Sequence, residues 1–234
     1  MLMHDLSLGT GILLVDDHPI IRFGFAALLG QFDNSFVFYE TDNARGAMEL
    51  AEVHRPRLAI LDLSLAGILS LELIKRLRRM VPNMVVLVVS MHDEKLYAER
   101  ALGAGARGYV MKQLAAKSII QAVQCVLAGK VWLSEDVRED LVNRIAHTAN
   151  SPNLLHELSD REITIFRLIG MGMKKSGIAK ELNLSPHTVE THRSNIKQKM
   201  GLTTGAELYR LAFLHSQDEA PLPVDGRAHT TGFP

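Results

Sequence analysis

The run LAIL at residues 58–61, followed by Asp62, decides the fold class of this chain. Its four residues are apolar without alternation, and VVLVV at residues 85–89 repeats the pattern and ends at Ser90. A strand that is apolar on both faces is typical of a parallel sheet covered by helices on both sides. Both runs therefore predict central strands of an α/β domain.

Strand-like runs and amphipathic helical patterns alternate on both sides of these two strands. The predicted strands are residues 12–15, 36–39, 58–61, 84–89 and 108–111. The predicted helices are residues 20–29, 44–54, 69–80, 96–102 and 115–127. Five strand–helix units in about 117 residues predict an open, doubly wound parallel sheet of five strands.

The pattern changes after residue 128. A helical pattern at 131–146 leads into a polar stretch, and only short helical patterns follow from 154 to 214. The final residues contain three prolines and few groups able to pack, which predicts disorder. We therefore predict a first domain, a helical linker, a second, all-α domain of four helices and a disordered tail, at residues 11–128, 129–152, 153–216 and 217–234.

Composition excludes several classes of protein. The 234 residues are 47% hydrophobic and 22% charged, as in ordinary folded domains. One cysteine allows no internal disulfide, no apolar run reaches the roughly 18 residues of a membrane span, and the start lacks the basic residues of a secretory signal. We therefore expect a cytoplasmic protein. Residues 151–216 hold nine basic and six acidic residues, which fits nucleic-acid binding or a solvated helix face.

Polar side chains follow four of the predicted strands: Asp16 and Asp17, Asp62, Ser90 and Lys112. Ligands of open α/β sheets bind beyond these strand ends. Three carboxylates repel one another, and Mg²⁺, which prefers oxygen ligands, relieves that repulsion. One carboxylate can then attack a phosphoryl group whose charge Lys112 neutralises, while Ser90 donates a hydrogen bond. The pattern predicts an aspartyl-phosphate site, although a single aspartate at a strand end is more often a turn or capping residue.

Two helix starts mark the second domain. Ser159 and Glu162 have the spacing of a capping box. Ser185 is a natural N-cap, and Pro186 takes the first position of a helix that reaches Met200. A short helix, a tight turn and this longer helix predict a helix-turn-helix.

The wheel of the longer helix has an inner and an outer face. Val189, Ile196 and Met200 share the inner face, whereas the outer polar residues suit base edges in a major groove. Nearby lysines suit phosphates, while Arg193 falls near the inner face. The predicted DNA-binding residues are Lys174, Lys175, His187, Thr188, Glu190, Thr191, Arg193, Ser194, Lys197 and Gln198. A plain helical bundle with a solvated face stays the alternative.

Four motifs of the first domain resemble the receiver domain of bacterial response regulators: VDDHP (15–19), LDLS (61–64), VSMHD (89–93) and GARGY (105–109), together with Lys112. The resemblance implies a flavodoxin-like fold in which Asp62 is the phosphoacceptor.

The same resemblance implies roles for further residues of the site. Asp16, Asp17, Asp62 and the backbone carbonyl of Ser64 would hold Mg²⁺. Ser90 and Lys112 would contact the phosphoryl group, and Tyr109 would be an aromatic switch. One departure is the loop after Asp62, where Leu65-Ala66 and Leu69-Ser70 replace the family's usual Met-Pro and Asp-Gly.

The motifs LSDRE (158–162), LSPHTVETHR (184–193) and KMGL (199–202) resemble the LuxR-type helix-turn-helix. In that family, Glu190, Thr191 and Ser194 match the base-facing positions. Both domains together resemble a two-component response regulator of the NarL/FixJ type. This implies that a sensor histidine kinase phosphorylates Asp62, which frees or dimerises the second domain for binding to double-stranded DNA.

Two other functions stay as alternatives to this one. The altered loop after Asp62 permits an atypical receiver that a partner or ligand controls in place of phosphate. An aspartate-nucleophile phosphatase more often carries a second carboxylate two residues after the nucleophile, and Ser64 stands there. We therefore expect that the protein is not an enzyme.

Overall fold

The computed structural model describes residues 9–65, 68–146 and 154–218. The chain divides into two units, residues 1–161 and 162–234. Within the described residues, every helix is too short or too polar to span a bilayer.

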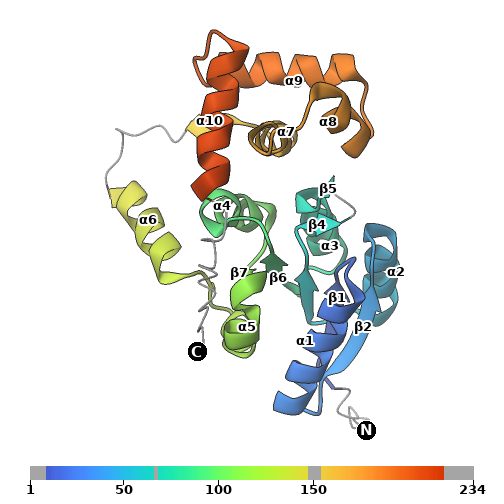
Figure 1. Cartoon of the computed structure of the whole chain (residues 1–234). Coiled ribbons are helices and arrows are strands. Elements are labelled where there is room, and N and C mark those ends of the chain that lie inside the picture. Colours follow the sequence, from blue (N-terminus) through green and yellow to red (C-terminus); the bar gives the residue numbers. More distant parts are fainter. Residues whose placement is uncertain (1–8, 66–67, 147–153, 219–234) are drawn as a thin grey trace, which may run out of the picture. The chain divides into compact units, whose positions relative to one another are not determined.

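The first unit is built on a five-stranded parallel sheet, as predicted (Figure 1). Its strands are β1 (Gly11–Val15), β2 (Val37–Thr41), β3 (Leu58–Leu61), β6 (Val85–Ser90) and β7 (Gly108–Met111). They lie in the order β2-β1-β3-β6-β7. From β1 the chain adds β2 on one side of the sheet and then β3, β6 and β7 on the other. This change of side between β1 and β3 creates the crevice in which such sheets bind ligands.

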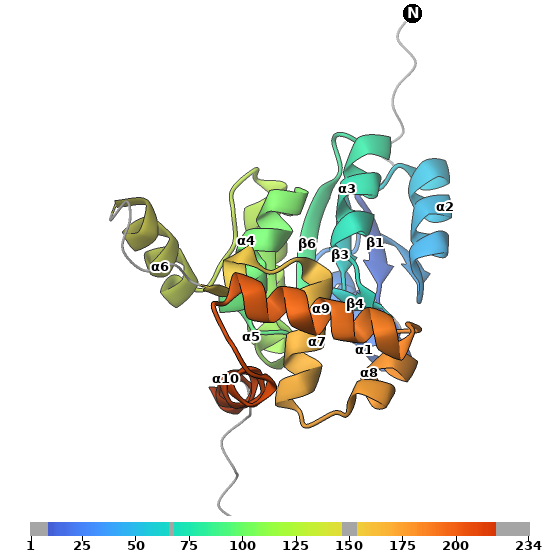
Figure 2. The ribbon, with the colours of Figure 1, turned by 90° about the horizontal axis from the view of Figure 1, so that it is seen from above.

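Helices cover both faces of the sheet. They are α1 (Pro19–Phe32), α2 (Ala44–His54), α3 (Leu71–Met80), α4 (Glu94–Ala104) and α5 (Lys112–Leu127). α1 and α5 cover one face, and α2, α3 and α4 cover the other (Figure 2). All four residues of β3 are buried, because both of its faces are covered.

A small antiparallel hairpin, which was not predicted, follows Asp62. It pairs β4 (Ser64–Leu65) with β5 (Ile68–Leu69). The pairing keeps residues 68–69 extended, so α3 begins at Leu71 and not at the predicted residue 69.

The segment after α5 also differs from the prediction. The helix expected at 131–146 begins later, as α6 (Glu135–Ala146). Trp132 instead forms a parallel bridge with Gly108 at the edge of β7, and this pairing holds the chain extended before the helix. The polar part of the predicted linker, residues 147–152, lies outside the described residues.

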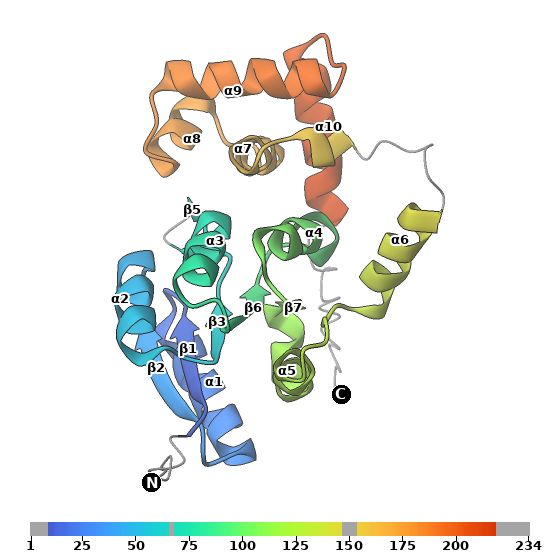
Figure 3. The same cartoon turned by 180° about the vertical axis from the view of Figure 1, so that it is seen from behind.

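The second unit is helical, as predicted (Figure 3). After the short 3-10 turn η1 (Leu154–Glu157) come α7 (Asp160–Gly170), α8 (Lys175–Glu181), α9 (Pro186–Lys199) and α10 (Gly205–Asp218). Ser185 caps α9 by accepting a hydrogen bond from the Thr188 N–H at 3.0 Å. α10 includes the first two residues of the predicted tail, and residues 219–234 lie outside the described part of the chain.

Candidate functional site

The predicted carboxylates meet at the carboxyl ends of the strands. Asp16 and Asp17 follow β1, and Asp62 follows β3, on the two sides of the reversal in strand order. One ligand atom from each of Asp16, Asp17, His18 and Asp62 lies within 4.8 Å of the others. Because three of these groups are carboxylates, the donor set fits a small hard cation such as Mg²⁺.

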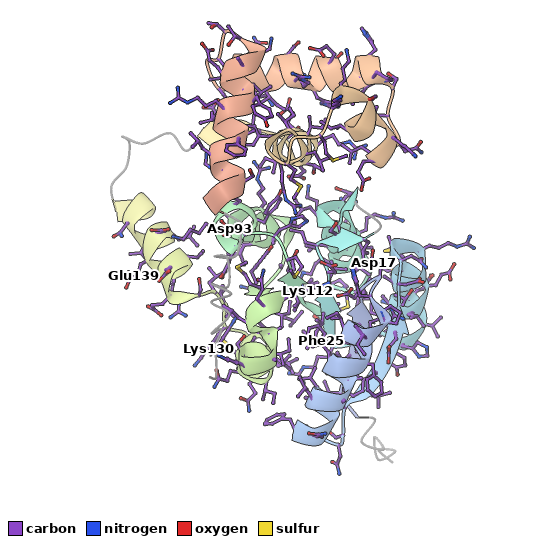
Figure 4. The ribbon with its side chains drawn as sticks, in the orientation of Figure 1. Asp17, Phe25, Asp93, Lys112, Lys130 and Glu139 are labelled. Atoms are coloured by element: carbon purple, nitrogen blue, oxygen red, sulfur yellow. The ribbon has the colours of Figure 1, made fainter. Side chains whose placement is uncertain are left out.

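Lys112 lies across this acidic pocket. It is the first residue of α5 (Figure 4), and its Nζ is 2.6 Å from Asp16 Oδ2 and 2.9 Å from Asp62 Oδ2. Its side chain is only 6% exposed. Burial opposes the charge on Lys112, but hydrogen bonds to the two carboxylates raise its pKa above the ordinary value. The ammonium therefore stays charged and neutralises part of the pocket.

Asp62 lies at the centre of the pocket and is 5% exposed. Burial raises its pKa, while Lys112 and the backbone N–H of Ser64 oppose that shift. The Ser64 N–H donates to Asp62 Oδ1 at 3.2 Å, and Lys112 binds Oδ2. Each oxygen of the carboxylate thus has its own donor, which fixes the orientation of the group.

Ser90 and Tyr109 are linked through the backbone of His92. Ser90 ends β6 and is fully buried. The His92 N–H donates to Ser90 Oγ at 3.2 Å, and the His92 carbonyl accepts a hydrogen bond from the Tyr109 hydroxyl at 2.9 Å. Tyr109 is 1% exposed, and burial raises its pKa well above the ordinary value. Its side chain therefore points into the protein, and its hydroxyl stays neutral.

Two histidines, neither of which was predicted as a site residue, also belong to the site. His18 Nδ1 lies 2.7 Å from Asp17 Oδ1 and 3.1 Å from Asp16 Oδ1. His92 lies between Ser90 and Tyr109 and packs its ring against Tyr97, with centroids 4.9 Å apart. His18 stands inside the motif VDDHP (15–19) and His92 inside VSMHD (89–93), and that position was the available signal.

The helical wheel predicted for residues 186–200 matches the structure of α9. Val189, Ile196 and Met200 are buried. The exposed residues of α9 are Pro186, His187, Thr191, Ser194, Asn195, Gln198 and Lys199. Among the predicted DNA-binding residues, Lys174 and Lys175 are also exposed at the start of α8, while Thr188, Glu190, Arg193 and Lys197 are half-buried.

Several charged residues of the second unit have partners within it. Lys175 Nζ lies 3.5 Å from Glu190 Oε2. Arg193 lies beside Gly205, so that a side chain at position 205 would meet its guanidinium. Lys199 donates to the buried Glu162 at 2.6 Å, which ties the end of α9 to the start of α7. Two ion pairs therefore hold α9 against α8 and against the start of α7.

Comparison with known proteins matches two separate parts of the chain to two families. Residues 12–124 match the family described as "Response regulator receiver domain", and residues 156–212 match "Bacterial regulatory proteins, luxR family". The Fimbriae Z protein of Salmonella typhimurium is 34% identical over 88% of this chain and 97% of its own length. The transcriptional activator protein ExaE of Pseudomonas putida is 36% identical, over 86% of this chain and 95% of its own.

One of the similar solved structures is bound to a promoter. RcsB from Salmonella enterica serovar Typhimurium, bound to a promoter in the presence of the phosphomimetic BeF3⁻, is 25% identical with a TM-score of 0.54. The match covers 88% of this chain and 99% of that one.

Proposed function

This chain belongs to the response regulators that join a receiver domain to a LuxR-type helix-turn-helix, and we propose that phosphorylation of Asp62 controls its binding to DNA. The family consists of DNA-binding transcription regulators of two-component systems, and phosphorylation is its general mode of activation. The single observation that carries the proposal is the pocket in which Lys112 bridges Asp16 and Asp62.

The proposed reaction is transfer of a phosphoryl group from a phosphohistidine of a sensor kinase. A carboxylate oxygen of Asp62 attacks phosphorus, the new P–O bond forms as the P–N bond breaks, and the released imidazole takes a proton from water. Lys112 neutralises the equatorial oxygens, and Ser90 donates a hydrogen bond to one of them. Mg²⁺, held by Asp16, Asp17, Asp62 and the Ser64 carbonyl, would supply further positive charge.

The proposed output is recognition of double-stranded DNA by α9. Its exposed residues have the size and chemistry to contact base edges, and Lys174 and Lys175 suit phosphates. A homodimer would place two copies of α9 in successive major grooves, so we propose a roughly two-fold symmetric site. The promoter-bound RcsB structure supports this output for a related chain.

The test is labelling with radioactive acetyl phosphate in the presence of Mg²⁺. Asp62→Asn should abolish incorporation because it removes the nucleophilic oxygen. Asp42→Asn, an exposed aspartate after β2, is the matched control and should be labelled at the wild-type rate. Incorporation into Asp62→Asn at an undiminished rate would remove Asp62 from the role of phosphoacceptor.

A second candidate function is control by a protein partner or small ligand without phosphorylation. The β4–β5 hairpin favours it, because this paired segment lies beside Asp62 at the positions where the sequence departs from the family's usual Met-Pro and Asp-Gly. A calorimetric titration with beryllofluoride and Mg²⁺ distinguishes the two functions. Saturable binding supports phosphorylation, and no binding supports the alternative.

A further inference from the structure

The segment after α5 is attached to the free edge of β7. The Trp132 N–H donates to the Arg107 carbonyl, and the Tyr109 N–H donates to the Trp132 carbonyl, both at 3.0 Å. Gly108 permits this approach, because a Cβ there would lie 3.0 Å from the Cβ and the carbonyl oxygen of Trp132. The start of the linker is therefore paired directly with the strand that carries the switch tyrosine.

Glu94, the first residue of α4, makes a second attachment. Its carboxylate is 5% exposed and accepts the Ser134 N–H at 2.8 Å. Ser134 also caps α6, accepting the Val137 N–H at 3.4 Å. The carboxylate thus sits at the N-terminus of α6 and anchors the start of the helix through its oxygen acceptor. We call Glu94, Trp132 and Ser134 the linker clamp.

The clamp shares its supports with the phosphorylation site. Tyr109 gives its backbone N–H to the clamp and its hydroxyl to the His92 carbonyl. His92, which also donates to Ser90, lies two residues before Glu94. A displacement of Ser90 or Tyr109 therefore acts on both attachments of the linker at once.

We infer that Glu94 is a positioning residue that couples the state of Asp62 to the linker leading to the DNA-binding domain. The inference rests on the proposed function, since it takes phosphorylation of Asp62 as the input. In the structure Tyr109 points inward and the clamp is closed, so both belong to one state. Phosphorylation of Asp62 stabilises this state, and the closed clamp then fixes the start of α6 on the receiver.

The test uses the full chain with beryllofluoride and Mg²⁺ as the phosphate mimic. Hydrogen exchange of a peptide covering residues 130–138 reports the amides of the clamp, and DNA titrations with and without beryllofluoride give a stimulation ratio. In wild type, beryllofluoride should slow exchange in this peptide and raise DNA affinity. Glu94→Ala removes the acceptor, so exchange should be fast in both states and the stimulation ratio should fall about fivefold or more.

Two matched variants separate coupling from general damage. Glu94→Gln keeps an oxygen acceptor for Ser134 and should restore the stimulation ratio. Lys95→Ala removes only an exposed pair with Asp140, at 3.9 Å, and should behave as wild type. If Glu94→Ala does not fold, Ser134→Pro is measured in its place, because it removes the donor N–H and keeps the carboxylate.

The outcomes distinguish the inference from the proposal beneath it. Wild type that binds no beryllofluoride refutes the role of Asp62 and with it the coupling. Wild type that binds beryllofluoride, beside a Glu94→Ala variant with an unchanged stimulation ratio, overturns the coupling alone. Faster exchange at 130–138 on adding beryllofluoride to wild type would also overturn it.

Discussion

Replacing Lys112 by Met should destabilise the receiver in a magnesium-dependent way. Lys112 is almost fully buried and is bonded to both Asp16 and Asp62, so its loss leaves two buried carboxylates without their cation. Breaking a buried pair by removing one partner costs about 3–5 kcal/mol. A divalent cation in the pocket replaces the missing charge, and a ligand at 100 times its Kd stabilises by about 2.7 kcal/mol. Saturating Mg²⁺ should therefore stabilise Lys112→Met by more than it stabilises wild type, in which Lys112 already occupies the two carboxylates, and so reduce the loss.

The assay is urea unfolding followed by the fluorescence of Trp132. This is the only tryptophan of the chain, and it lies in the first unit, so the signal reports on the receiver. Lys117→Met, at an exposed position of the same helix, is the control and should change the free energy of unfolding by less than about 0.5 kcal/mol. A loss below about 1 kcal/mol for Lys112→Met, or one that Mg²⁺ leaves unchanged, would refute the reasoning.

Three further predictions concern other parts of the molecule. Gly170→Ala places a Cβ 2.3 Å from the Ala212 carbonyl oxygen, so α7 and α10 must move apart at a cost of about 1–3 kcal/mol. An unchanged melting temperature of the second unit, measured by circular dichroism, would contradict that packing. Burial raises the pKa of Glu94 above its ordinary 4.5, with Asp93 and Asp136 adding to the shift, so its contribution to stability falls as pH rises through the raised pKa. Glu94→Gln should therefore gain stability relative to wild type between pH 4 and pH 7 in urea titrations, and an equal difference at both pH values would disprove this. DNA affinity should fall steeply between 50 and 200 mM salt, about tenfold or more in fluorescence anisotropy, whereas a flat dependence would argue against groove docking.

Sequence periodicity was sufficient for the elements that bury continuous apolar surface. The runs at 58–61 and 85–89 predict central parallel strands, because few other structures bury both faces of a short segment. The topology then places Asp16, Asp62 and Lys112 at one edge, so most of the pocket followed from the strand ends.

The features that the sequence did not predict depend on pairing. β4 and β5 have two residues each, too few to show a period. The apolar residues at 131–133 fit a helix. They are extended instead, because Trp132 then pairs with the backbone carbonyl of Arg107 and the backbone N–H of Tyr109 at the edge of β7. Glu94 finds its partner forty residues along the chain, and no local pattern marks it.

The pairing of Trp132 with β7 also decides where a stable fragment of the receiver can end. A polypeptide stopped at residue 128 would leave the Tyr109 N–H and the Arg107 carbonyl at a bare sheet edge, ready to recruit a strand from another molecule. One extended to Ala146 keeps both groups satisfied and gives the Glu94 carboxylate its donor. A receiver that is crystallised or labelled alone should therefore end at residue 146. The shorter piece, which ends at residue 128, would aggregate through its bare sheet edge.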